Sequence, residues 1–248
     1  MRAFVLHLTR AQARKENAQE LLMTCGLPGE IWEAVDGQAL SASDLDALRK
    51  PASFEPNYPF DLNLGEIGCF LSHRQIWAEI VSRDLAFGLV LEDDVKIDPM
   101  HFGEAQVLAE RNIERFGYIQ FQNRKSGGSV AIDFEGKAVL SQPDVTPLRA
   151  SAQMISKSAA QKLLDLTKTF DRPVDTFGQS HWHTGLRPGV IYPAGITTIS
   201  DQLDGSTIQT ETGRGAVDIM RREWSRMSYR RQVKRSAAQS AAPIVKPD

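Results

Sequence analysis

The sequence is poor in cysteine, contains no long apolar run and has almost no net charge. Its 248 residues include only Cys25 and Cys69, which excludes a disulfide-stapled framework and favours a reducing compartment. No stretch approaches ~18 consecutive apolar residues, and the apolar run after Met1 is too short for a signal peptide. A formal net charge of -2 lacks the basic surplus that binding to bulk nucleic acid requires. We therefore expect a cytoplasmic protein that binds no nucleic acid and does not span a membrane.

What is present is the composition of an ordinary folded protein. Hydrophobic residues make up 42% and charged residues 24% of the chain, enough for a substantial core in one large domain. We expect residues 1–216 to form this domain. Residues 217–248 differ in composition and are expected to form a basic C-terminal tail, helical at first and disordered from residue 236.

Hydrophobic periodicity predicts alternating strands and helices. A strand at 3–8, a helix that ends near residue 23 and a strand at 31–35 form a β-α-β opening, the common beginning of a parallel sheet. The expected elements after it are a helix at 41–50, a loop at 51–59, a helix from Asn63, a strand at 86–91, a helix at 100–116, a strand at 117–122, a hairpin within 130–140, a strand at 152–156, a helix at 156–167, a strand at 186–193 and a surface loop at 199–215. The predicted fold class is α/β, with a central, mostly parallel sheet flanked by helices.

Three consecutive acids follow the most apolar of these strands. Residues 86–91 are uncharged and mostly apolar, which indicates a strand buried on both faces. Glu92, Asp93 and Asp94 come next, at the edge where open α/β sheets bind their ligands. Clustered carboxylates stay ionised beside a cation, so a hard divalent ion that bridges to a phosphate is their natural partner. The alternative is a solvated acidic turn, and taken alone the three residues favour that alternative.

The helix from Asn63 has a polar side next to its apolar one. Asn63 and Glu66 have the spacing of a capping box. Glu66, Cys69 and His73 lie on one side of the helix. This side fits either a carboxylate and an imidazole directed at a site or a solvated flank with a satisfied histidine, and spacing does not decide whether it meets the acids after the strand.

The tail is strongly basic. Residues 221–235 contain seven Lys or Arg and one Glu, a sum of +6, together with Trp224, Met227 and Tyr229. Such a helix is either a solvated charged helix or an anchor to anionic lipid head groups.

Taken in order, these motifs resemble glycosyltransferase family 25, the group of lipooligosaccharide and collagen galactosyltransferases. The most specific match pairs GEIGCFLSH at 65–73 with LVLEDDV at 89–95. Weaker matches lie at 4–10, 33–37, 155–164 and 173–175. His7 and Thr9 depart from the family, which usually has an asparagine and an acidic residue there, and the region 120–150 matches poorly.

The resemblance implies a GT-A-like nucleotide-sugar-binding fold with Mn²⁺ or Mg²⁺ on the diphosphate of a UDP-sugar. Asp94 is the implied metal ligand, with Glu92 assisting. A divalent ion there suits the chemistry, because departure of UDP places negative charge on the β-phosphate. The implied donor-binding residues are Leu8, Thr9, Arg10, Arg14, Asp36, Ser72 and Asp93, the last through a ribose hydroxyl.

The resemblance also implies inversion, with in-line attack by an acceptor hydroxyl that needs a general base. Asp175 is the expected base, with Glu66 or His73 as substitutes. The alternative for Asp175 is a carboxylate that caps a helix or braces a loop. His181 and His183 are expected to be core or surface residues rather than metal ligands.

The expected function is metal-dependent transfer of a sugar, galactose by resemblance, from a UDP-sugar to a hydroxyl of a glycan such as lipooligosaccharide. With a lipid-linked acceptor, the basic tail would hold the enzyme at the cytoplasmic face of the inner membrane. Two other classes stay open: a receiver-like signalling module with Asp133 as phosphoacceptor, and an inactive glycan-binding scaffold.

Overall fold

The computed structural model describes residues 1–48, 54–199 and 216–246. Its centre is an eight-stranded sheet. The strands are β1 (Arg2–His7), β2 (Gly29–Glu33), β3 (Phe87–Glu92), β5 (Tyr118–Phe121), β6 (Ser129–Glu135), β7 (Ala138–Pro143), β8 (Ala152–Ser156) and β9 (Gly189–Tyr192).

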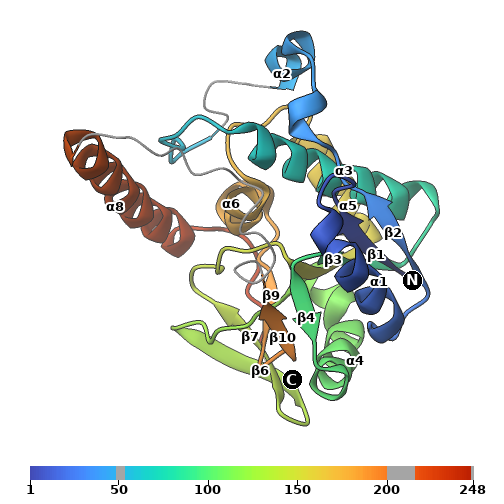
Figure 1. The fold of residues 1–248 in the computed structure, drawn as a ribbon. Helices are drawn as coiled ribbons and strands as arrows, with labels where there is room; N and C mark the ends of the chain where they lie inside the picture. The colour runs from blue at the N-terminus through green and yellow to red at the C-terminus, as the bar shows by residue number, and fades with distance from the viewer. Residues whose placement is uncertain (49–53, 200–215, 247–248) are drawn as a thin grey trace.

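The sheet has the order β2-β1-β3-β8-β5-β9-β7-β6 (Figure 1). The pairs β1–β2, β1–β3 and β5–β9 are parallel. Strands β8 and β7 run against the strands on either side of them, so the remaining strands share one direction. The predicted α/β class with a large central sheet is confirmed.

Helices cover both faces of this sheet. Helices α1 (Lys15–Thr24) and α4 (Pro99–Phe116) pack on one face, and α3 (Leu64–Ser82) and α5 (Lys157–Leu166) pack on the other. Side chains of β1 alternate accordingly, because Val5 belongs to the core under α1 and α4 while Phe4 belongs to the core under α3 and α5. This two-sided burial explains the apolar composition of the central strands.

Short elements complete the described chain. Strands β4 (Val95–Ile97) and β10 (Ile196–Thr198) form a small antiparallel sheet directly after the acidic motif. The other short elements are η1 (Gln12–Arg14), η2 (Gly37–Ala39), α2 (Ala42–Leu48), α6 (Val174–Gln179) and α7 (His181–Thr184). The long helix α8 (Ala216–Ala238) follows. No helix within the described ranges is long and apolar enough to cross a membrane. Apart from Ile199, the surface loop predicted at 199–215 lies outside the described residues.

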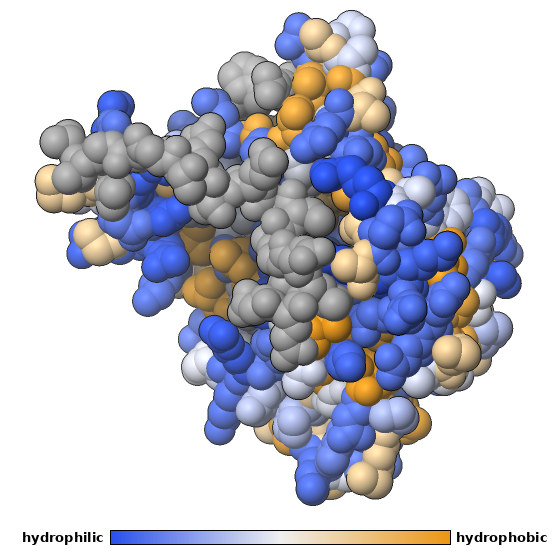
Figure 2. All heavy atoms as spheres, viewed as in Figure 1, coloured by the Kyte–Doolittle hydropathy of each residue, from blue (hydrophilic) through white to orange (hydrophobic). Residues whose placement is uncertain are grey.

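Helix α8 projects from the body and rests on it through one side (Figure 1). Tyr229, Val233 and Ala237 form the buried side, and Nη1 of Arg172 lies 3.4 Å from the Tyr229 hydroxyl. Figure 2 shows mostly hydrophilic residues on the visible side of α8 and hydrophobic ones gathered between α8 and the body. The inner side of α8 is therefore part of the fold.

The structure describes the segment after α8 as far as residue 246, where it contacts the body of the protein. The disorder that the sequence predicts from residue 236 stays a prediction. The hydroxyl of Ser240 lies 2.8 Å from Nδ1 of His181. The backbone N–H of Val245 donates to Oε1 of Gln142 at 2.9 Å, and Val245 packs against the core. Ala242 is buried and Val245 is partly buried, and composition alone does not reveal these contacts.

Candidate active site

A cleft lies at the carboxyl ends of β1 and β3, between the loop after β2 and the first half of α3. Its volume is about 160 Å³. The lining residues are Leu6, Leu8, Arg10, Arg14, Ala34, Val35, Asp36, Gly37, Gly65, Cys69, Ser72, Glu92 and Asp94. The two predicted metal ligands thus share one cavity with five of the seven predicted donor-binding residues, at the sheet edge where ligands of α/β proteins bind.

One wall of the cleft is a loop packed directly on α3. The Ser72 hydroxyl accepts a hydrogen bond from the Val35 N–H at 2.8 Å and donates to the Gly68 carbonyl at 2.7 Å. A Cβ added at Gly37 would lie 1.8 Å from the Leu64 carbonyl oxygen, so only glycine permits this approach. Ser72 was predicted to bind the donor, and its described contacts are to this loop and to its own helix.

Arg10 and Asp36 face each other at the mouth of the cleft. Nε of Arg10 lies 2.9 Å from Oδ2 of Asp36, and both side chains are partly exposed. Oδ1 of Asp36 accepts the N–H of Gln38 at 3.0 Å and caps η2. Thr9 lies in an adjoining open depression, where its hydroxyl donates to Glu33 at 2.8 Å. The pair Arg10–Asp36 therefore places one cation and one anion beside the acidic motif.

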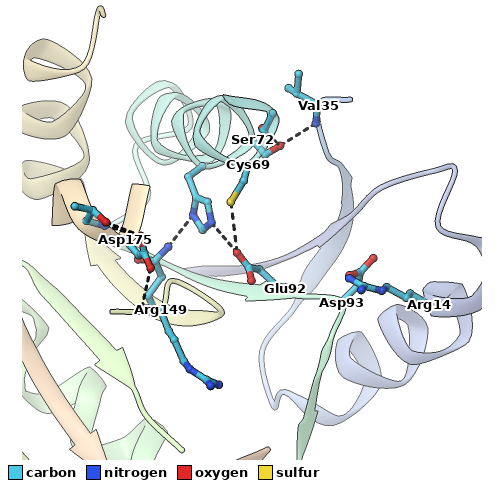
Figure 3. Close-up of polar contacts among 12 residues, drawn as sticks. Arg14, Val35, Cys69, Ser72, Glu92, Asp93, Arg149 and Asp175 are labelled. Carbon is cyan, nitrogen blue, oxygen red and sulfur yellow. Dashed lines mark hydrogen bonds and ion pairs between the residues drawn. The ribbon is translucent and has the colours of Figure 1, made fainter. Parts of the chain in front are cut away.

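The three consecutive acids point in different directions. Asp93 is buried, with its carboxylate oxygens 2.8 Å from Nδ1 of His7 and 3.2 Å from Nη1 of Arg14. Figure 3 shows Asp93 and Arg14 together on the side of Glu92 that faces away from Asp175. Asp93 thus connects the end of β3 to the helical turn before α1, and among the described residues it is not part of the cleft lining that Glu92 and Asp94 share.

Glu92 contacts α3 through the polar side predicted for that helix. Its Oε1 lies 3.3 Å from Nε2 of the fully buried His73 and 3.7 Å from Sγ of Cys69. Burial raises the pKa of Glu92, but hydrogen bonds from His73, Ser151 and Cys69 outweigh it and hold the pKa below the ordinary value. Glu92 is therefore a carboxylate, and spacing alone could not have shown this convergence.

Asp175 lies at the start of α6, on the opposite side of Glu92 from Asp93 (Figure 3). Its Oδ2 accepts the backbone N–H of Arg149 at 3.2 Å and its Oδ1 accepts that of Thr176 at 2.6 Å. Burial raises the pKa of Asp175, and the negative charge of Glu92 adds to the effect. A half-buried carboxyl with a raised pKa suits a proton acceptor, and the two backbone bonds also make it a brace for its loop.

Glu66 closes the capping box predicted at the start of α3. Its N–H donates to Oδ1 of Asn63 and its Oε2 accepts the N–H of Asn63, both at 2.9 Å. Burial raises the pKa of Glu66, and the charge of Asp175 acts in the same direction. Glu66 therefore interacts electrostatically with Asp175 and also caps the N-terminus of α3.

Two residues outside the predicted set, Gln153 and Arg149, contact residues of the site. Gln153 of β8 lies behind His73, with Nε2 2.7 Å from Nδ1 of the histidine. Its signal in the sequence is one amide side chain between the apolar residues Ala152 and Met154 of the strand. Arg149, which holds Asp175 through its backbone, has a φ of 106°, a conformation that no local pattern indicates.

Of the two histidines of α7, His181 is a core residue and His183 is half-buried. His181 is buried beside Ser240, and burial lowers its pKa to about 4. His183 stacks on Phe54 with 3.8 Å between the ring centroids. Asp133, the phosphoacceptor of the receiver hypothesis, lies on the edge strand β6 and pairs with Arg111 at 2.9 Å. Edge strand β6 is separated from β3 by four strands of the sheet, so the receiver hypothesis does not fit.

The donor atoms of the cleft suit a hard divalent ion. Glu92 and Asp94 both line it and offer carboxylate oxygens, the ligands that Mg²⁺ and Mn²⁺ prefer. The backbone next to Asp94 is fixed, because its carbonyl accepts the N–H of Ile199 at 2.8 Å. These two residues fit the ion that the sequence implied.

Comparison with known proteins identifies a family whose model matches most of the chain. A family model described as Glycosyltransferase family 25 (LPS biosynthesis protein) matches residues 1–178. A Glycosyltransferase 25 family member of Drosophila melanogaster is 29% identical over 240 residues, which cover 85% of this chain and 39% of that protein. Human procollagen galactosyltransferase 2 is 40% identical over 98 residues, 38% of this chain and 16% of that protein.

The comparison also finds a relative that is named inactive and a solved structure of a glycosyltransferase. Human inactive glycosyltransferase 25 family member 3 is 38% identical over 110 residues, 43% of this chain and 18% of that protein. A glycosyltransferase involved in the glycosylation of the major capsid of PBCV-1 aligns with a TM-score of 0.35 and 13% identity over 64% of this chain and 61% of that one. The chain spans about two fifths of the length of the Drosophila relatives it matches.

Proposed function

The chain belongs to glycosyltransferase family 25, and from this membership we propose that it transfers a hexose, galactose in the first instance, from a UDP-sugar to a glycan hydroxyl. The observation that carries the proposal is the cleft that Glu92, Asp94 and Arg10 share at the carboxyl ends of β1 and β3. Two carboxylates and a cation at this edge provide for a divalent ion and for a diphosphate.

Different residues of the cleft have different roles in binding the donor. Glu92 and Asp94 would hold Mn²⁺ or Mg²⁺, and an ion bound there would supply positive charge against the diphosphate of the donor. Arg10 adds positive charge at the mouth of the cleft, and Asp36 orients its guanidinium. Asp93 has a structural role, because its contacts with Arg14 and His7 fix the end of β3.

Asp175 removes the proton from the attacking hydroxyl. Its pKa is raised by burial, which makes it a stronger base than an exposed aspartate while its backbone hydrogen bonds keep it aimed. Glu66 is the alternative candidate for the general base. We assign His73 a positioning role, because its two ring nitrogens contact Glu92 and Gln153.

We also propose that the outer side of α8 docks to the cytoplasmic face of an anionic membrane. That membrane would carry the lipid-linked acceptor. Met220, Trp224 and Met227 recur at helical spacing and are exposed. Arg221, Arg230 and other basic residues flank them. Apolar side chains that enter the head-group region, with cations beside them, are the pattern of an interfacial helix.

UDP release from a panel of UDP-sugars, with and without Mn²⁺, tests the proposed function. Metal-dependent release from one sugar is the expected result. Binding of UDP without release from any sugar would instead support the scaffold hypothesis, to which the inactive relative lends weight.

A further inference from the structure

Three side chains of different chemistry converge on the floor of the cleft. Cys69 and His73 lie one helical turn apart on α3, and Glu92 ends β3. Sγ of Cys69 and Nε2 of His73 lie 3.7 and 3.3 Å from the same Oε1 of Glu92. All three atoms lie within 4.8 Å of one another.

The two spacings to Oε1 of Glu92 match edges of a tetrahedral zinc site, and the third edge of the cluster is shorter than 4.8 Å. With typical zinc bond lengths, ligand atoms at tetrahedral angles lie about 3.3 Å apart for nitrogen and oxygen and about 3.5 Å apart for sulfur and oxygen. The corresponding distances here are 3.3 and 3.7 Å. An ion can therefore enter with small movements of the side chains.

The ligand types distinguish this cluster from the pair Glu92–Asp94. Thiolate and imidazole favour Zn²⁺, whereas Mg²⁺ and Mn²⁺ favour carboxylate and water. Cys69 and Glu92 line the cleft, so an ion can reach them from solvent.

Gln153 supplies the outer partner that a zinc-bound histidine needs. When Nε2 of His73 binds a metal, Nδ1 carries the proton and must donate it. Gln153 lies 2.7 Å from Nδ1, and its Oε1 is buried without a hydrogen-bond partner among the described residues. A half-turn of the amide places Oε1 opposite Nδ1 and satisfies both atoms.

We propose that Cys69, His73 and Glu92 form a zinc site on the floor of the cleft. Binding releases the thiol proton of Cys69 to solvent, and the imidazole proton of His73 moves by exchange to Nδ1. Because Glu92 is shared, a bound zinc ion removes one ligand from the hard-ion site and inhibits transfer. Only this last consequence rests on the proposed function.

Cobalt spectroscopy on the full chain tests the site without any sugar donor. Co²⁺ should give the visible bands of a tetrahedral complex and a sulfur-to-cobalt charge-transfer band, and Zn²⁺ should displace it. Cys69→Ala should abolish the charge-transfer band and lower zinc affinity by at least about 100-fold, more than loss of an outer partner typically costs. Cys25→Ala is the matched control, because Cys25 is the chain's other cysteine and lies in the opposite core.

A wild-type protein with no charge-transfer band would overturn the proposal, as would a band that persists in Cys69→Ala or disappears in Cys25→Ala. Circular dichroism of each variant confirms that it is folded. The result is independent of transferase activity, since an inactive protein can still bind cobalt. In an active protein, saturating Zn²⁺ that leaves Mn²⁺-dependent UDP release unchanged would contradict the sharing of Glu92.

Discussion

Nη1 of Arg14 lies 3.2 Å from Oδ1 of Asp93, and this buried ion pair separates the middle one of three consecutive acids from its neighbours. Asp93 also faces Nδ1 of His7 at 2.8 Å, and Nδ2 of Asn17 donates to its backbone carbonyl at 2.8 Å. The acidic motif therefore combines a structural acid with two acids that line the cleft.

Asp93→Ala should lower the free energy of unfolding by about 3 kcal/mol, because removing one member of a buried pair leaves the other charge poorly compensated. Urea unfolding followed by circular dichroism measures the change. Glu79→Ala is the control, since it breaks the exposed ion pair with Arg83 and should cost no more than about 1 kcal/mol. If Asp93→Ala is as stable as the wild type but has lost UDP affinity, Asp93 is a donor ligand and not a brace.

Asp175→Asn should lower turnover by at least about 100-fold while UDP affinity stays near the wild-type value, because a general base acts on the acceptor. Steady-state kinetics and UDP titration measure the two quantities separately. Arg149 and Thr176 donate their backbone N–H groups to different oxygens of Asp175, so the single side-chain oxygen of asparagine can keep one of these two bonds. Loss of UDP binding would assign Asp175 to the donor site, and an unchanged rate would make it a loop brace only.

The pH profile provides a separate test of Asp175. Burial raises its pKa above the ordinary 3.8, and a base works only when ionised, so kcat/KM should fall as pH drops through this raised pKa. The folded state holds the proton more tightly than the unfolded state, so this residue's contribution to stability should decline as pH rises from 3.8 through the raised pKa. Both effects should be absent in Asp175→Asn. An acid limb that survives the substitution would assign it to another group.

The sequence predicted much of this arrangement because the signals are local. The capping box at Asn63 and Glu66 and the apolar strand before Glu92 each follow from a few neighbouring residues. The direction of Asp93 could not be predicted, since it depends on Arg14, which is 79 residues away in the chain. Gln153 was missed for the same reason, because its partner His73 lies 80 residues away and on another element.

Trp224→Ser combined with Met227→Ser should weaken binding to anionic vesicles by about tenfold or more, because each side chain loses apolar area that would enter the head-group region. These side chains are 70% and 49% exposed. Truncation before α8 is less informative, because it also removes the buried Tyr229. Co-sedimentation at low and high salt measures the binding, which should be weaker at high salt.

Phe134→Ser is the matched control for the α8 variant, since Phe134 is 74% exposed but lies on the edge strand β6. It should bind vesicles as the wild type does. Equal recovery of wild type and the α8 variant at both salt concentrations would reject the membrane surface.

The measurement that tests the central claim most directly is UDP affinity of the wild type and Asp94→Asn, each with and without Mn²⁺. Asp94 lines the cleft beside Glu92, so the wild type should bind UDP more tightly with Mn²⁺, and Asp94→Asn should lose this dependence together with transfer while it keeps its fold. Removal of one charge from a cluster of carboxylates also relieves repulsion, so its stability should not decrease. A variant that retains Mn²⁺-dependent UDP binding and most of the transferase activity would contradict the metal site on which the account depends.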